Sequence, residues 1–146
     1  MKKGSLIREA AFILVFEKIF RREESCDEII ESAKEAEIFD FGEGSVDEKD
    51  FDKVSVSVFR GVYDNLDELD GIISSYSEKR QIGRISKVSL AVLRLAVYEI
   101  KHNDKVPTNV AVSEAVNLAK KYGFDADVKF VNGVLGRFAE SVEAKA

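Results

Sequence analysis

Few residues in this sequence have the types and spacing that catalysis requires. His102 is the only histidine and Cys26 the only cysteine, and neither has neighbours at the spacing of a zinc site. Cys26 is expected at the start of a helix, where a thiol pKa can fall, but no base is recognisable nearby. His102 is expected at a helix end, facing solvent or capping carbonyls. The carboxylates of residues 23–52 are spread along helical faces and a loop, as on a solvated surface. We therefore predict no enzyme activity, no metal and no cofactor.

The composition is that of a soluble globular protein. The chain has 146 residues, of which 45% are hydrophobic and 34% are charged, enough for one domain with a substantial core. A lone cysteine cannot form an internal disulfide, which favours a reducing compartment. We find no signal peptide and no apolar run of the length that a membrane span needs. The sequence therefore predicts a cytoplasmic protein without membrane contact.

Charge is distributed unevenly along the chain. The formal net charge is −5, but residues 1–22 carry a net +4, residues 23–52 a net −11 and residues 79–105 a net +5. Because local fields rather than net charge govern contact, the acidic average does not exclude an anionic partner. Charge alone favours the plainer interpretation, in which surface lysines and arginines only maintain solubility.

The elements that must position these side chains are predicted to be helices. Only one proline occurs, and glycines fall mostly at junctions, which favours helix over strand. The fifth predicted helix is apolar on nearly every side and should be central. Gly123 should end the sixth, and Asp125 or Asp127 should cap the last. We expect an all-α bundle of about seven helices, with starts near Leu6, Ser25, Asp47, Asn65, Ser86, Pro107 and Asp125; Ser25 and Asn65 have capping-box patterns.

One stretch of the last predicted helix contradicts itself. Residues 129–138 read KFVNGVLGRF, in which Asn132-Gly133 is a strong hairpin signal. The flanking residues fall instead at the spacing of an amphipathic helix; they are Phe130, Val131, Val134, Leu135 and Phe138. The central predicted helix raises a related question, because it contains Arg94 and Glu99. A charge among apolar residues must pair or reach the surface, so we interpret both as members of a structural ion-pair or capping network, with Glu114 as one candidate partner.

Four segments resemble the NusB family of transcription antitermination factors: REAAFILVF (residues 8–16), VLRLAVYEI (92–100), VPTNVAVSEAVNLAKKYG (106–123) and KFVNGVLGRFA (129–139). The resemblance spans the chain and implies a single domain over residues 1–146, with two helical subdomains of roughly 1–78 and 79–146. It also places FVNG inside a helix of the second. On this reading Gly133 allows a close backbone approach and Asn132 is a buried structural residue. Contact of Asn132 with RNA is the alternative.

The same resemblance implies a function. NusB proteins are bacterial factors that pair with the ribosomal protein NusE and bind the boxA element of nascent RNA. They join other Nus factors on RNA polymerase and suppress premature termination, notably in ribosomal RNA operons. Homodimers of the free protein are a further expectation.

Binding to single-stranded RNA needs cations for phosphates and aromatic faces for bases. By resemblance, the RNA-binding candidates are Lys2, Lys3, Arg8, Tyr76, Lys79, Arg80, Lys120, Lys121, Tyr122, Lys129 and Phe130. Phe130 could equally belong to the core. The chain also departs from its relatives, because they often open with a dense arginine cluster, carry Trp where Arg80 stands, and have an acid followed by a basic residue at Ser89-Leu90. A protein-only adaptor with little RNA binding is therefore an alternative, and a module serving an RNA-modifying enzyme is a third.

Overall fold

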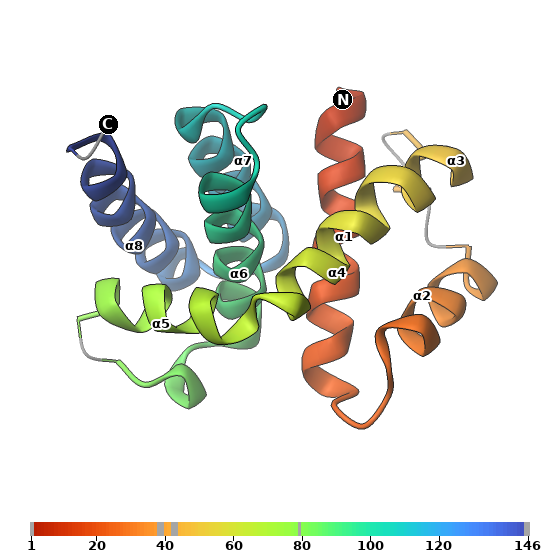
Figure 1. Cartoon of the computed structure of the whole chain (residues 1–146), viewed down its shortest axis with the longest axis horizontal. Helices are drawn as coiled ribbons and strands as arrows, with labels where there is room; N and C mark the ends of the chain where they lie inside the picture. Colours follow the sequence, from red (N-terminus) through yellow and green to blue (C-terminus); the bar gives the residue numbers. More distant parts are fainter. Residues whose placement is uncertain (1, 38–39, 42–43, 79, 145–146) are drawn as a thin grey trace. The chain divides into compact units, whose positions relative to one another are not determined.

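The structure, a computed structural model, describes residues 2–37, 40–41, 44–78 and 80–144 and is helical (Figure 1). Within these residues the only β feature is an isolated bridge between Asp40 and Ser45. The elements α3, η1 and α4 follow one another without a break and form one helical rod. Counted as one helix, this rod and the other six α-helices described agree with the expected all-α bundle of about seven helices. The elements are α1 (Lys3–Phe20), α2 (Cys26–Glu35), α3 (Glu48–Asp50), the π-helical η1 (Phe51–Ser55), α4 (Val56–Asp64), α5 (Leu66–Tyr76), the 3-10 turn η2 (Ile82–Arg84), α6 (Lys87–His102), α7 (Thr108–Tyr122) and α8 (Asp125–Ala144).

The chain divides into two compact units, Met1–Asp64 and Asn65–Ala146. This boundary lies before α5, whereas the sequence-based boundary lay near residue 78. The physical reason is that α5 packs against α6 and α8 and so belongs to the second unit. None of the helices that the structure describes is long and apolar enough to cross a bilayer.

The first unit is built on α1, which contacts α2, η1 and α4. Two hydrogen bonds fix the α4 rod on α1: the Ser55 hydroxyl donates to the Ile7 carbonyl at 2.8 Å, and the Tyr63 hydroxyl donates to the Val15 carbonyl at 3.2 Å. Ser55 lies in the π-helical turn and is fully buried, where its hydroxyl must find an acceptor. The buried face of α1 consists of Leu6, Glu9, Ala10, Ala11, Phe12, Leu14 and Val15.

Helix starts agree with the sequence in most places. Ser25 and Glu28 form the predicted capping box of α2, each side chain bonding the other's backbone N–H. Asp47 directly precedes α3, and Ser86 caps α6 by accepting from the Ser89 N–H at 3.1 Å. Asn65 stands before α5 as expected, but its side chain makes no capping bond. The predicted capping box at Asn65 is therefore wrong, although the helix start is right.

The second unit is organised around α6, which packs against α5, α7 and α8. Its residues from Ser89 to Val97 are all buried, as the continuous apolar stretch predicts. Arg94 is buried and forms a two-bond ion pair with Asp70 of α5, from Nε to Oδ1 at 2.8 Å and from Nη2 to Oδ2 at 2.9 Å. Arg94 thus has an ion-pair partner, as interpreted from the sequence, and that partner is Asp70 of α5. Glu114, the candidate that the sequence suggested, is half-buried on α7. Glu99 is buried on the same helix.

Asp127 joins the starts of α6 and α8. Its Oδ2 accepts from the Phe124 N–H at 2.8 Å, which caps α8, and its Oδ1 accepts from the hydroxyls of Ser89, at 2.7 Å, and Ser86. Burial by itself would raise the pKa of Asp127. The hydrogen bonds from Phe124, Ser86 and Ser89 outweigh it, so the pKa lies below its ordinary value. Of the two candidates, Asp127 is the one that bonds the helix start, from the third position of α8 to the N–H of Phe124, as the acidic residue of a capping box does.

α8 runs unbroken through Asn132-Gly133, so the helical reading of KFVNG is confirmed and the hairpin signal is overridden. The role assigned to the two residues is wrong, however. Asn132 is exposed, and a Cβ on Gly133 would meet only the end of the Arg137 side chain at 3.5 Å, an ordinary contact. The helix tolerates both residues because they point away from the stripe that packs on the bundle, formed by Val131, Val134, Leu135 and Phe138.

The close approach lies instead at Gly123, between α7 and α8. A Cβ there would come within 2.7 Å of Asp127 Oδ2 and 3.0 Å of the Ala119 carbonyl oxygen. Gly123 ends α7 as predicted, with an extended backbone. The glycine is therefore required by space rather than by conformation.

Candidate nucleic-acid interface

The surroundings of Cys26 and His102 do not favour catalytic chemistry. Cys26 is half-buried, and desolvation is the main cause that raises the pKa of its thiol, so the start of α2 does not activate it. His102 is exposed at the end of α6, as expected from the sequence. Its Nε2 lies 2.6 Å from Glu68 Oε1 on α5, and its ring packs on that of Tyr98. Among the residues described, no group of His, Cys, Asp and Glu side chains is arranged to hold a metal.

The N-terminal basic residues lie on the first unit. Lys2 and Lys3 are exposed and Arg8 is half-buried. Lys3 Nζ forms an ion pair with Asp50 Oδ2 at 3.0 Å, and this hydrogen bond is the main cause that raises the pKa of Lys3. A phosphate would therefore compete with a carboxylate for Lys3.

Two predicted residues of the second unit come together. The Arg80 guanidinium carbon lies 4.6 Å from the centre of the Phe130 ring, a cation–π contact between the loop after α5 and the second turn of α8. Phe130 is half-buried and Arg80 is exposed. The Phe130 ring is therefore not part of the hydrophobic core, and Arg80 covers part of its surface. The contact holds a guanidinium, which binds phosphate well, against an aromatic surface.

Three further candidates gather where α7 ends. Lys120 and Lys121 occupy its last turn, and Lys121 Nζ lies 5.6 Å from the centre of the Tyr122 ring. Tyr122 is 37% exposed. Lys129 is exposed on α8. The second unit thus presents cations beside aromatic rings at the α7–α8 junction, while Lys79 falls outside the described residues.

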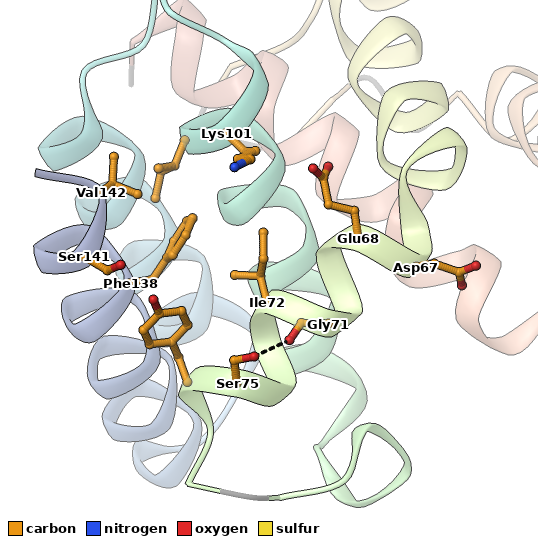
Figure 2. Close-up of a pocket in the computed structure, with 11 residues that line it drawn as sticks. Asp67, Glu68, Gly71, Ile72, Ser75, Lys101, Phe138, Ser141 and Val142 are labelled. Atoms are coloured by element: carbon orange, nitrogen blue, oxygen red, sulfur yellow. Dashed lines mark hydrogen bonds between the residues drawn. The ribbon is translucent and has the colours of Figure 1, made fainter. Parts of the chain in front are cut away.

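Tyr76 has a different environment from the other candidates. Its ring packs 5.6 Å from that of Phe138, and its carbonyl accepts from Arg137 Nη2 at 2.6 Å. Both rings line a groove of about 720 Å³ between α5, α6 and α8, shown in Figure 2. Asp67 and Glu68 lie along one side of this groove, and carboxylates disfavour phosphate. The ring of Tyr76 therefore serves helix packing in this structure.

A second groove, of about 410 Å³, runs between α7 and α8. Asn132 lines it together with Asn109 and Asn117, and Lys120 lies at its rim. Asn132 is exposed in this groove, so its contact with RNA, the alternative that the sequence left open, stays a prediction. The structural role that the sequence suggested for Asn132 required a buried side chain, and the side chain is not buried.

Sequence reasoning missed one residue of this region. Phe124 is 83% exposed, the first residue after the Gly123 stop and the last before α8. The sequence does contain a signal for this residue. Phe124 lies between Gly123, which ends one helix, and Asp125, which begins the next, so it belongs to the apolar stripe of neither helix. Asp70 was missed as well, since nothing local marks it as the partner of Arg94.

The acidic stretch forms a separate surface on the first unit. Arg60 of α4 pairs with Asp27 of α2, and Lys34 Nζ pairs with Asp52 Oδ1 at 2.8 Å. Most other carboxylates of this stretch are exposed. They are a solvated surface, as predicted, and one that repels phosphate.

Residues 5–140 match the sequence profile of the NusB family. The chain belongs to the NusB family. The transcription antitermination protein NusB of Acetivibrio thermocellus is 48% identical over 82 residues, which cover 56% of this chain and 57% of that protein. The similarity to this relative thus spans little more than half of its length.

Solved structures of NusB proteins extend the similarity to nearly the whole chain. NusB of T. maritima is 38% identical with a TM-score of 0.79, over 96% of this chain and 93% of that one. A structure of antitermination factors NusB and NusE in complex with double-stranded RNA contains a chain that is 24% identical, with a TM-score of 0.81, over 97% of this chain and 98% of that one. At this identity the second match establishes the fold alone.

Proposed function

We propose that this chain is a transcription antitermination factor that binds boxA-type single-stranded RNA together with the ribosomal protein NusE. In this role it would join other Nus factors on RNA polymerase and suppress premature termination, notably in ribosomal RNA operons. Such a role is one of binding and not of catalysis, and its place is the cytoplasm. Family membership over residues 5–140 is the observation that carries the proposal.

The second unit supports RNA binding by its side chains. The Arg80–Phe130 contact offers a guanidinium for phosphate, and Lys121 lies beside the Tyr122 ring. Lys120 and Lys129 add two exposed ammonium groups on α7 and α8. Contacts of this kind bind single strands without needing a duplex groove, because bases stack on rings while cations track the backbone. The loop and the two helices that carry them belong to one compact unit.

A requirement for NusE follows from the small number of cations. Each phosphate contact contributes a share of affinity that falls with salt, and one of the three N-terminal candidates, Lys3, is already paired with Asp50. We therefore expect weak RNA binding by the chain alone and measurable binding by the pair.

The decisive experiment measures binding of a boxA-like single-stranded RNA, with and without NusE, across a salt series. Reversing Lys120, Lys121 and Lys129 to Glu should weaken binding and flatten its salt dependence. The matched control reverses Lys49, Lys53 and Lys105, which are also exposed but lie far along the chain from Tyr122 and Phe130. Phe130→Ala should lower affinity with little change of slope, because stacking releases no counterions.

A protein-only adaptor is the second candidate, and the Lys3–Asp50 ion pair favours it. If the wild-type pair binds boxA-like RNA no more tightly than NusE alone at every salt concentration, the RNA-binding role is refuted and the adaptor remains. Co-elution of this chain with NusE in the absence of RNA would then be its direct support.

A further inference from the structure

The most exposed large hydrophobic side chain that the structure describes is Phe124, at 83%, ahead of Phe20 at 60%. Phe124 lies between α7 and α8, at the N-terminal end of α8. Its ring contributes nothing visible to the core of the second unit. An aromatic surface of this size that remains in water is a feature of binding sites more than of folding.

The backbone that carries Phe124 is fixed on both sides. The Phe124 N–H donates to Asp127 Oδ2 at 2.8 Å, and its carbonyl accepts from the N–H groups of Asp127 and Val128 at 2.9 and 3.2 Å. Asp127 is itself held by Ser86 and Ser89. A ring displayed on a fixed backbone loses little entropy when a flat ligand stacks on it.

The neighbours of Phe124 along the chain are aromatic and cationic. Tyr122 is two residues before it, with Lys121 beside the tyrosine ring, and Lys120 and Lys129 are exposed. Of the acids at this junction, Asp127 is buried and hydrogen-bonded, and Asp125 is exposed. Lysine is depleted in protein–protein interface cores, whereas aromatic rings among cations are what single-stranded nucleic acids bind.

We propose that Phe124 stacks on one base of the bound single-stranded RNA, with Lys120, Lys121 and Lys129 holding the phosphates on either side of that base. This inference rests on the proposed function and deepens it, because it adds a base contact at the α7–α8 junction beyond the Arg80–Phe130 pair. The stacking is sequence-tolerant, since every base has a flat face.

The test uses the full chain with NusE and a boxA-like single-stranded RNA. Phe124→Ala should lower affinity about 5- to 150-fold, the range that corresponds to removal of one stacked base, and should leave the salt slope unchanged. Phe124→Tyr should restore affinity. Phe20→Ala, which removes a comparably exposed phenylalanine of α1, is the matched control and should bind as wild type.

Tryptophan fluorescence can detect the contact between residue 124 and an RNA base directly. The chain contains no tryptophan, so Phe124→Trp introduces a single indole, and its emission should be quenched when the RNA is added. Phe20→Trp should show no quenching, and the wild-type mixture supplies the background. Stacking is the direct cause of such quenching, which a merely structural role of Phe124 would not produce.

Each outcome decides the question. If the wild-type pair binds RNA while Phe124→Ala binds equally well and the indole emission of Phe124→Trp is unchanged, the stacking role is overturned and the proposed function stands. If Phe124→Ala weakens association with NusE in the absence of RNA, the ring contacts protein and the inference is again wrong. If the wild-type pair binds no RNA, the proposed function fails and this inference with it.

Discussion

At the scale of single residues, the close backbone approach that the sequence suggests for Gly133 lies at Gly123, which also ends α7 as predicted. We expect Gly123→Ala to destabilise the protein by about 1–3 kcal/mol, because the new methyl group would press on Asp127 and on the Ala119 carbonyl. Gly133→Ala should be neutral or stabilise by up to about 1 kcal/mol, since it removes a flexible residue from a helix without a clash. Chemical denaturation of both variants measures the difference. Equal stabilities would contradict the assignment of the close approach to Gly123.

Asp127 makes a pH-dependent contribution to stability. Its folded-state pKa lies below the ordinary value, so its stabilising effect is complete above the unfolded pKa of about 3.9. The effect is lost as the pH falls through the lower folded pKa. Asp127→Asn should therefore cost about 1.5–3 kcal/mol at pH 7, as for hydrogen bonds to a charged acceptor. The difference in the free energy of unfolding between wild type and Asp127→Asn should become smaller below about pH 4, as measured by denaturation at several pH values. A difference that does not depend on pH would contradict this account.

At the scale of helices, the Arg94–Asp70 pair fixes α5 on α6. Removing one partner should cost about 3 kcal/mol, the low end for buried pairs, because the Asp70 side chain keeps 22% of its exposure. Arg94→Leu with Asp70→Leu should cost less than either single change, since no charge is then left buried.

A surface pair provides the comparison for this prediction. Arg137 and Glu78 lie 3.7 Å apart and are both well exposed, so Glu78→Ala should change stability by less than about 1 kcal/mol. Thermal or chemical denaturation of the four variants measures both pairs. If Asp70→Leu proves as mild as Glu78→Ala, the pair does not hold α5 in place.

Helix identities and most helix starts were predictable because they depend on local information. The apolar stretch of α6 and the caps at Ser25 and Ser86 can be recognised within a few residues. The placement of Asn132 and Gly133 outside the core could also have been predicted, because the stripe of Val131, Val134, Leu135 and Phe138 does not include either residue. Phe130 also falls at helical spacing, but it is half-buried against Arg80 and is not part of that stripe.

Contacts between residues that are far apart in the chain could not be predicted from the sequence. Arg80 meets Phe130 and Arg94 meets Asp70 only because the helices of the second unit pack as they do, and no spacing rule encodes such pairs. The same holds for the boundary between the units, since it depends on the packing of α5 against α6 and α8. The RNA-binding candidates therefore included residues with different environments, among them Tyr76, whose ring packs on Phe138.

At the scale of the whole chain, the two units differ in charge. The first unit carries 16 acidic and 10 basic side chains, whereas the second carries 11 acidic and 12 basic ones. The net charge of −5 therefore originates in the first unit. An RNA strand should meet less repulsion on the second unit, and within the first the basic segment is residues 1–22, which carry a net +4.

This distribution leads to a prediction for the N-terminal residues. Lys2→Glu and Lys3→Glu, combined with Arg8→Gln because Arg8 is half-buried, should weaken RNA binding by the NusE pair. The salt dependence should flatten by up to about 0.7 log units of slope for each phosphate that is no longer neutralised. Binding titrations at several salt concentrations measure both quantities. Unchanged affinity and slope would exclude the start of α1 from the RNA path.

The hydrogen bonds that join α1 to the α4 rod have a consequence for synthesis of the chain on the ribosome. Ser55 bonds Ile7 and Tyr63 bonds Val15, each across 48 residues. At about 5–20 residues per second, α1 waits roughly 2–10 s after it is made before the residues that cover it have been added. During that interval Phe12, Leu14 and Val15 have no partner from α4. The nascent chain therefore exposes its most apolar helix early, and that interval is where a chaperone that binds apolar segments would act.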